Sequence, residues 1–390
     1  MLTPKLLVIS TFLLIVATPP MVQFAVEAAR GERPGALEIL TRRPTAANLR
    51  DYEHALQNDS ITARALRPVM QATQFFAFRD AGDKALMGPG GWLFYQPGVS
   101  FLTQRARTGD STVKDAVTAV VRFRDDLASR GIRLIVLPAP NKESVYPDQL
   151  AWFATPPQQA IGDETRAFLA QANAAGVEVV DLFAHFGAAR RTSSAPLYLE
   201  QDTHWSPVGM EMAASAVAAR VLERGWLTRG SIDYMARPAP VRELGDLVQM
   251  IRSRLIEARV PPEAIATTQV VRRDTGALFT DDPSPEVLVL GDSFMRIYQL
   301  DPPGRAGFVA HLALELRCTV AGIVNDGGGS TLVRQDLFRR PRLLSRAKVV
   351  VWEFVERDIR FGAEGWRFVP LPRAEMGKQT VGIRSTSHVF

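Results

Sequence analysis

Four short apolar runs, separated by stretches with helical periodicity, constrain this sequence more than any other feature. Uninterrupted apolar runs of this length are typical of strands that are buried on both faces. Strands that alternate with helices predict an α/β fold in which helices flank a mainly parallel sheet, giving three layers. The runs are IRLIVLPAP (132–140), VEVVDLF (177–183), EVLVLGD (286–292) and AKVVVWEFV (347–355).

The segments between these runs carry helix signals. Residues 113–131 and 163–176 precede the first two runs, and each segment ends in glycine, a common helix stop. Residues 206–225 begin with Ser206 as an N-cap and Pro207 in the first turn, which together predict a helix start. Ligands bind at the carboxyl ends of the strands in such sheets, so the residues directly after each run are candidates for chemistry.

The first 30 residues hold Lys5 and then a nearly uncharged apolar run to Val26, interrupted by Pro19 and Pro20. About twenty apolar residues can cross a bilayer, so an uncleaved signal anchor is expected. A cleaved signal peptide, with VATPP or VEAAR as an imperfect cleavage site, and a buried soluble helix are the alternatives. With Lys5 inside, the positive-inside rule places the remaining chain outside the cytoplasm, which in a bacterium is the periplasm.

The chain is expected to have three regions. These are a signal anchor or signal peptide (1–30), a linker with a helical lead-in (31–84) and one catalytic domain (85–390). Near the start of that domain, GPGGWLFYQPGV (88–99) predicts a hairpin or a short strand at the sheet margin. The last stretch, EMGKQTVGIRSTSHVF (375–390), reads as a tail or one last strand.

Composition excludes several classes of protein. The chain is 46% hydrophobic and 22% charged, which predicts a folded rather than a disordered protein. Its net charge of +5 permits acidic partners, but there is no run of five or six basic residues, so no nucleic acid is expected. The single cysteine, Cys318, excludes an intrachain disulfide and a cysteine-based metal site, and reads as a buried structural thiol.

Ser293, in VLVLGDSFMRIY, is the candidate nucleophile. Residues 287–290 predict a buried strand, Gly291 and Asp292 a turn, and the following residues a helix. Ser293 would then lie at the carboxyl end of a strand, where N–H groups of a helix start favour a developing negative charge. The structural alternative is a serine that only caps the helix.

A serine hydroxyl is a poor nucleophile unless a base takes its proton. His204, in YLEQDTHWSPVGMEMA, is the best candidate among five histidines, because Asp202 lies two residues before it. In an extended segment, residues two apart point the same way, so Asp202 could hold one imidazole nitrogen while the other faces Ser293. The alternatives are a capping aspartate with a structural histidine, or an Asp-x-His metal site. The chain offers few further ligands, so no metal is expected.

QDTHW followed by VLVLGDSF, in that order, resembles the alginate O-acetyltransferase family of AlgJ and AlgX type, which acetylates bacterial exopolysaccharides through an SGNH hydrolase-like domain. GGWLFY, LPAPNKESVYPD and VVVWEFVER resemble it too, and the similarity spans roughly residues 85–360. The resemblance implies that Ser293 takes the acetyl group as an ester and passes it to a sugar hydroxyl, with His204 as base and Asp202 as its orienter. It implies no cofactor.

The oxyanion of such a reaction needs N–H donors about 3 Å away. The Ser293 N–H is one candidate, and the loop VNDGGGS offers Asn325 and Gly327, although its glycines serve a turn equally well. Six further residues could line the cleft or contact the glycan. Four of them have a structural alternative: a core position for Trp205 and Tyr298, and an ion pair for Glu353 and Arg357. The six residues are Lys142, Tyr146, Trp205, Tyr298, Glu353 and Arg357.

Three functions remain open at this point. The first is a periplasmic O-acetyltransferase, anchored in the inner membrane, that acts on an exopolysaccharide and receives acetyl groups from a membrane-bound donor protein, as the resemblance implies. An acetylesterase would use the same residues, with water in place of the sugar hydroxyl. A non-catalytic glycan-binding scaffold is the third, and the presence of Ser293, His204 and Asp202 argues against it.

Overall fold

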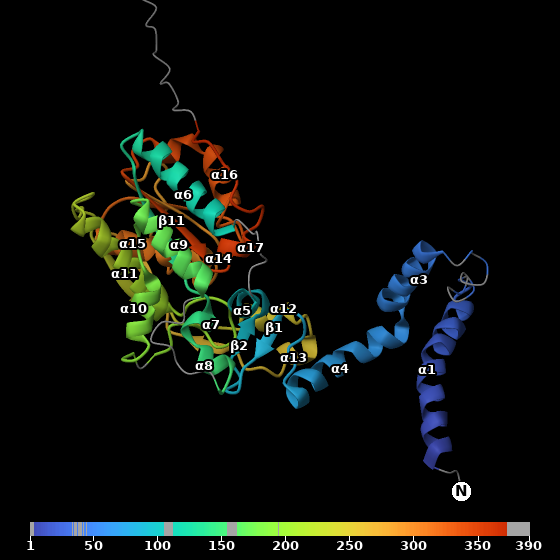
Figure 1. Cartoon of the computed structure of the whole chain (residues 1–390). Helices are drawn as coiled ribbons and strands as arrows, with labels where there is room; N and C mark the ends of the chain where they lie inside the picture. The colour runs from blue at the N-terminus through green and yellow to red at the C-terminus, as the bar shows by residue number, and fades with distance from the viewer. Residues whose placement is uncertain are drawn as a thin grey trace, which may run out of the picture. The chain divides into compact units, whose positions relative to one another are not determined.

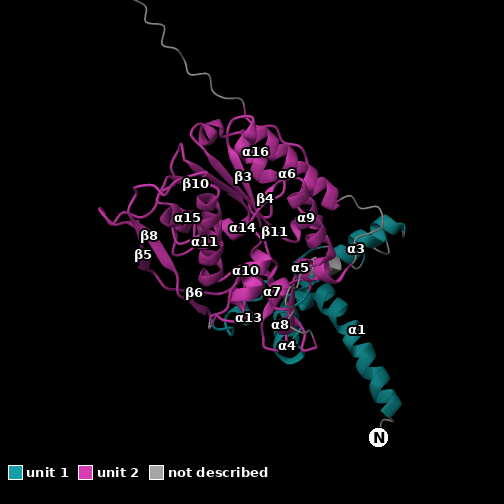
Figure 2. Cartoon of the chain, turned by 60° about the vertical axis from the view of Figure 1, so that its left-hand side comes forward, with its two compact units in different colours: residues 1–82, 251–261 teal, residues 83–250, 262–390 magenta. Residues whose placement is uncertain are grey.

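The computed structural model of the chain forms two compact units (Figure 2). One comprises residues 1–82 and 251–261, and the other residues 83–250 and 262–390. The C-terminal stretch 375–390, expected to be a tail or strand, lies outside the described residues. The structure describes residues 4–32, 34, 37, 41, 43, 45–104, 112–153, 162–193 and 195–372.

The first unit is helical (Figure 1). Helix α1 (Pro4–Ala29) continues through Pro19 and Pro20, none of its residues is buried, and its most apolar window has a mean hydropathy of 1.9. It is therefore long and apolar enough to cross a membrane, as expected of an anchor. The unit also contains α3 (Ala46–Asp59), α4 (Ile61–Phe78) and α13 (Arg254–Glu257).

The second unit is built on a five-stranded sheet in which all strands are parallel. All four apolar runs form strands of it, which confirms the predicted sheet. The fifth strand, β10, ends where the loop VNDGGGS begins, a loop that the sequence places after a strand. The spatial order is β10 (Val320–Val324), β9 (Val287–Gly291), β11 (Val349–Val355), β3 (Arg133–Ala139) and β4 (Glu178–Val179).

Side chains of the central strands alternate between two cores, one on each face of the sheet. In β3, Leu134 and Val136 belong to one core, whereas Ile135 and Leu137 belong to the other. Several helices contribute buried residues to each core, and three on each face represent the outer layers, which confirms the three-layer arrangement (Figure 1). The helices are α6 (Thr112–Ala128), α9 (Asp163–Ala174) and α16 (Leu332–Phe338) on the first face, and α10 (Leu182–Ala189), α11 (Pro207–Glu223) and α15 (Phe308–Leu316) on the second.

The local signals for α11 and for the hairpin are also confirmed. Ser206 caps α11 by accepting a hydrogen bond from the Gly209 N–H at 3.3 Å. The segment 88–99 contributes β2 (Leu93–Tyr95), which pairs antiparallel with β1 (Ala85–Met87). Cys318 is buried, and burial raises the pKa of its thiol to about 12, as expected for a structural cysteine.

The segment between α11 and β9 had no predicted structure. It forms two antiparallel pairs, β5 (Tyr234–Pro238) with β8 (Thr268–Arg272) and β6 (Val241–Glu243) with β7 (Glu263–Ile265), and also α12 (Asp246–Met250). The second unit also contains six further short helices among its described residues. They are α5 (Gln96–Thr103), α7 (Lys142–Val145), α8 (Pro147–Leu150), α14 (Ser293–Arg296), η1 (Pro341–Leu344) and α17 (Asp358–Phe361).

Candidate active site

Ser293 lies in a tight turn at the carboxyl end of β9 and begins α14. It does not cap the helix, because Asp292 does: its Oδ1 accepts from the Phe294 N–H at 2.9 Å, and its Oδ2 accepts from the Val355 N–H at 3.2 Å. Gly291 leaves the room that this turn needs. A Cβ there would lie 2.3 Å from the Met295 Cγ.

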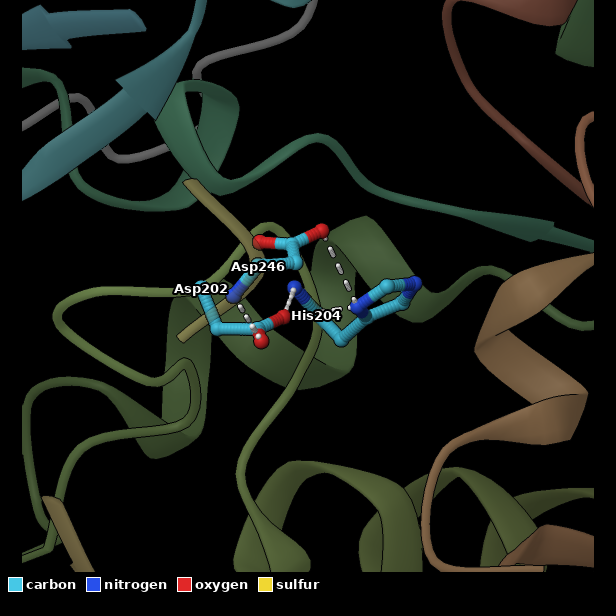
Figure 3. Close-up of side chains that lie close together, drawn as sticks. All are labelled: Asp202, His204 and Asp246. Carbon is cyan, nitrogen blue, oxygen red and sulfur yellow. Dashed lines mark hydrogen bonds and ion pairs between the residues drawn. The ribbon is translucent and has the colours of Figure 1, made fainter. Parts of the chain in front are cut away.

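His204 lies in a loop between Tyr198 and Trp205, which form an antiparallel bridge. The expected extended geometry is wrong, since residues 200–204 form bends. The contact itself is present for another reason. Asp202 Oδ1 accepts from the His204 N–H at 2.9 Å, as in an Asx turn, and lies 2.6 Å from the His204 Nδ1 (Figure 3). Asp202 is therefore in direct contact with the imidazole, and its role as the orienter of a catalytic base stays a prediction.

Lys142 is hydrogen-bonded to the backbone of the loop that carries His204. Its Nζ donates to the carbonyl oxygens of Leu93 (2.6 Å), Glu200 (2.8 Å) and Asp202 (3.1 Å). Only 2% of Lys142 is exposed, and burial lowers its pKa to about 8. The expectation that Lys142 lines the cleft is therefore wrong. Tyr146 is likewise buried and accepts a hydrogen bond from the Leu197 N–H at 2.9 Å.

Asp246, at the start of α12, is the main residue that sequence reasoning missed. Its Oδ1 accepts from the Thr203 N–H at 2.8 Å and its Oδ2 from the Thr203 Oγ1 at 2.7 Å, while its own N–H donates to Asp202 Oδ2 at 2.8 Å. Asp246 Oδ2 also lies 3.7 Å from the His204 Nδ1 (Figure 3). It follows no predicted strand, so only its contacts reveal it.

The pKa values show how strongly these groups interact. Burial alone would raise the pKa of Asp202 and lower that of His204, but their mutual attraction outweighs it. The pKa of Asp202 falls to about 2, and that of His204 rises to about 9, with a further contribution from Asp246. Burial and the Asp202 charge raise the pKa of Asp246 to about 6. The loop is therefore built to favour a charged imidazole.

Ser293 and His204 line one pocket with a volume of about 670 Å³. Among the described residues, the His204 Nε2 is buried without a hydrogen-bond partner. The imidazole packs edge-on against the ring of Phe294, with 4.9 Å between centroids, and Phe294 directly follows Ser293. The lining residues are Tyr95, Asp202, Thr203, His204, Glu243, Leu244, Asp246, Gln249, Met250, Ser293, Arg296, Ile297, Asp301, Pro302, Asp326, Gly327 and Arg357.

Two of the other predicted residues reach this pocket. Gly327 lines it in the loop after β10. Arg357 lines it after β11, with its guanidinium 5.0 Å above the Tyr95 ring. A second arginine of the pocket, Arg296, is engaged by Asp301 at 2.9 Å and Asp326 at 2.8 Å.

Four predictions of substrate contact are corrected. Trp205 and Tyr298 are core residues with 0% and 1% exposure, which leaves no face for a sugar, and the Tyr298 hydroxyl donates to the Trp205 carbonyl. Asn325, a candidate oxyanion donor, uses its backbone N–H to donate to the Gly291 carbonyl at 3.0 Å and its side-chain amide to donate to Asp336 at 2.7 Å. Glu353 is fully buried and accepts from the Asp292 N–H at 3.0 Å, so it supports the turn at Ser293.

Asp202, His204 and Asp246 have ligand atoms within 4.8 Å of one another, a spacing that a metal ion could use. Their atoms already serve in the hydrogen bonds described above: Asp202 Oδ1 with His204, and both Asp246 oxygens with Thr203. That no metal is needed stays a prediction.

Residues 85–356 match the model of one protein family, described as "SGNH hydrolase-like domain, acetyltransferase AlgX". The match covers well over half of the chain. The chain belongs to this family. It is thus an acetyltransferase of the SGNH hydrolase-like class, in agreement with the resemblance seen in its motifs.

The chain is also similar in sequence to individual proteins named as alginate O-acetylases. The chain is 30% identical over 305 residues to the "Probable alginate O-acetylase AlgJ" of Pseudomonas putida, covering 74% of each chain. It is 26% identical over 317 residues to the protein of the same name in Pseudomonas aeruginosa, covering 75% of each chain.

Two solved structures of the family share the fold. The O-acetyltransferase domain of Pseudomonas putida AlgJ superposes with a TM-score of 0.58 at 25% identity, covering 71% of this chain and 92% of that domain. Pseudomonas aeruginosa AlgX superposes with a TM-score of 0.50 at 19% identity, covering 70% of this chain and 62% of that protein.

Proposed function

We propose that this acetyltransferase moves acetyl groups onto hydroxyls of an alginate-like bacterial exopolysaccharide, with Ser293 as nucleophile, His204 as general base and Asp202 as its orienting carboxylate. One observation carries the proposal. The His204 Nδ1 is held by Asp202 at 2.6 Å, its Nε2 has no hydrogen-bond partner among the described residues, and His204 and Ser293 line the same pocket. A base held in one tautomer beside a hydroxyl is the arrangement that activates a serine.

In the first half of the reaction, the Ser293 oxygen attacks the acetyl carbonyl carbon and His204 takes the hydroxyl proton. The carbonyl oxygen becomes negative and is stabilised by backbone N–H groups, for which Ser293 and the neighbouring loop at Gly327 are the candidates. When the bond to the donor breaks, His204 gives the proton to the leaving group, and acetyl-Ser293 remains.

In the second half, a sugar hydroxyl attacks the carbonyl carbon of acetyl-Ser293. His204 takes the proton of that hydroxyl and returns it to the Ser293 oxygen as the ester bond breaks. The sugar leaves as its acetyl ester, so one acetyl group has moved and no proton is gained or lost. Arg357 and Tyr95 lie on the pocket wall, where they can contact the glycan.

The proposal includes a location and partners. Helix α1 supports an inner-membrane anchor with the catalytic unit in the periplasm, and the alginate O-acetylases among the relatives support a polysaccharide acceptor. Acetyl-CoA is not expected outside the cytoplasm, so a membrane-bound protein would deliver the acetyl group.

The experiment compares the full-length chain in detergent with a Ser293→Ala variant on a chromogenic acetyl ester. We expect the variant to lose acetate release by at least about 10³-fold, because the proposed mechanism carries the acetyl group on the Ser293 oxygen. Mass spectrometry of the wild type should find the acetyl group on the peptide that contains Ser293. Unchanged activity in the variant would exclude the mechanism.

Adding acetyl acceptors to the same assay separates the alternatives. Faster turnover with acetylated glycan as product supports a transferase, whereas acetate release that no glycan accelerates supports an esterase. A folded protein that binds glycan but shows no turnover and no acetyl-Ser293, even with a membrane donor fraction, would indicate a scaffold.

A further inference from the structure

Asp246 lies beside the proposed catalytic residues but has no part in the mechanism above. Its side chain is 27% exposed, lines the pocket, and places Oδ2 at 3.7 Å from the His204 Nδ1. That distance is too long for a hydrogen bond but short enough for a substantial attraction to a charged imidazole in a partly buried site.

Asp246 is connected to both residues that precede His204. Two hydrogen bonds join its carboxylate to Thr203, and its backbone N–H donates to the second oxygen of Asp202. Asp202 thus uses one oxygen for His204 and the other for Asp246. The start of α12 therefore fixes the loop that carries the imidazole.

The backbone at Gly245, directly before α12, packs closely against the backbone of Gln201 in the His204 loop. A Cβ on Gly245 would lie 2.2 Å from the carbonyl oxygen of Gln201, which is backbone and cannot turn aside. Only glycine allows residues 245 and 201 to pack this closely. The contact brings Asp246 against the loop at a fixed distance.

Three carboxylates around His204 act in the same direction. Asp202, Asp246 and Asp292 all favour its protonated form. Two cations lie nearby: Lys142, which is bound to the carbonyl of Asp202, and Arg357, which lines the pocket and acts on Asp292. The imidazole becomes positive when it takes the serine proton, so a second carboxylate stabilises that state.

We propose that Asp246 is a second positioning carboxylate of His204, which holds Thr203 so that the imidazole keeps its orientation and stabilises the imidazolium formed as Ser293 loses its proton. The inference rests on the proposed function, because it requires His204 to be the base. It assigns a role to a residue outside the Ser293, His204 and Asp202 set.

The test is Asp246→Asn in the full-length chain, with acetyl-ester turnover measured from pH 5 to 10. Asparagine keeps the shape of the carboxylate, and its amide can still accept from the Thr203 N–H, so the variant removes the charge. We expect kcat at the alkaline plateau to fall on the order of ten-fold with little change in KM. The midpoint of the pH-dependent rise should move down by about one pH unit.

Two variants sharpen the result. Asp246→Glu restores the charge and should return the midpoint toward the wild-type pH. Asp274→Asn removes the same charge from an exposed ion pair with Arg272 outside the pocket, and should leave the profile unchanged.

Wild-type kinetics in Asp246→Asn, or a lower kcat with an unmoved midpoint, would overturn the proposal while leaving the role of Ser293 intact. If Ser293→Ala retains activity, His204 is not the base and the role of Asp246 falls with it. A shifted midpoint that Asp246→Glu restores supports the proposal even if Asp246→Asn also lowers stability.

Discussion

His204 shows how one buried pair can make both catalysis and stability depend on pH. Its pKa rises from the usual 6.5 to about 9 in the folded chain. Folding therefore gains from the protonated imidazole below pH 6.5, and this gain is lost as the pH rises through 9. The size is on the order of 3 kcal/mol for a shift of this extent.

We predict that the free energy of unfolding changes less between pH 6 and pH 9.5 in the His204→Gln variant than in the wild type. The free energy of unfolding in urea would be measured for wild type and variant at pH 6 and pH 9.5, because the other buried groups titrate in both proteins. The wild type should exceed the variant by more at pH 6 than at pH 9.5. If the wild type exceeds the variant in unfolding free energy by the same amount at both pH values, the raised pKa of His204 is contradicted.

At this scale, the sequence predicted the residues that carry their own local signal. Asp202 and His204 are two residues apart, and Ser293 follows an apolar strand and a Gly-Asp turn, so short-range patterns single them out as candidates. Trp205, Tyr298 and Asn325 have the residue types of a sugar site, but their roles depend on which way they face. Only the packing of distant segments decides that.

At the scale of elements, the strength of the apolar pattern decided what could be predicted. The runs that form β3, β9 and β11 are long and uninterrupted, since both of their faces are buried. Strand β10 has a weaker pattern because it contains Gly322, which weakens a strand signal. Asp246 was missed because α12 has only five residues and its position depends on a contact with a loop more than forty residues earlier.

The approach of α12 to the His204 loop gives a prediction of its own. In Gly245→Ala, the new Cβ would meet the Gln201 backbone at 2.2 Å, so Asp246 must move away from Asp202 and Thr203. We expect kcat for ester turnover to fall on the order of 10–100-fold, because small displacements of a catalytic group are costly.

Gly162→Ala is the matched control for Gly245→Ala. Its Cβ would meet only the Leu102 Cδ2, at an ordinary 3.7 Å. Thermal unfolding of both variants would show whether the fold survives. Equal turnover in the two glycine variants would mean that the position of α12 does not matter for the site.

For the whole molecule, α1 is the candidate membrane anchor. Its 26 residues give a length of roughly 39 Å, more than the hydrocarbon core of a bilayer requires. We predict that the full-length chain stays in the membrane fraction after an alkaline carbonate wash and that a variant without residues 1–30 is recovered in the soluble fraction.

The truncated variant should retain ester turnover, because every residue that lines the pocket lies between Tyr95 and Arg357. N-terminal sequencing of the full-length product is the control. A mature chain that begins beyond Ala29 would show cleavage, and the anchor would then be a signal peptide.

The order of the strands has a consequence for biogenesis. Strand β3 pairs with β11 from Arg133↔Val349 to Ala139↔Val355, so its central partner is synthesised more than two hundred residues later. If the chain crosses the membrane from its N-terminus, the sheet cannot close until almost the whole polypeptide has emerged. Until then β3 exposes an apolar edge, a state that favours aggregation. The nascent enzyme should therefore depend on holding chaperones at the exit of the translocation channel.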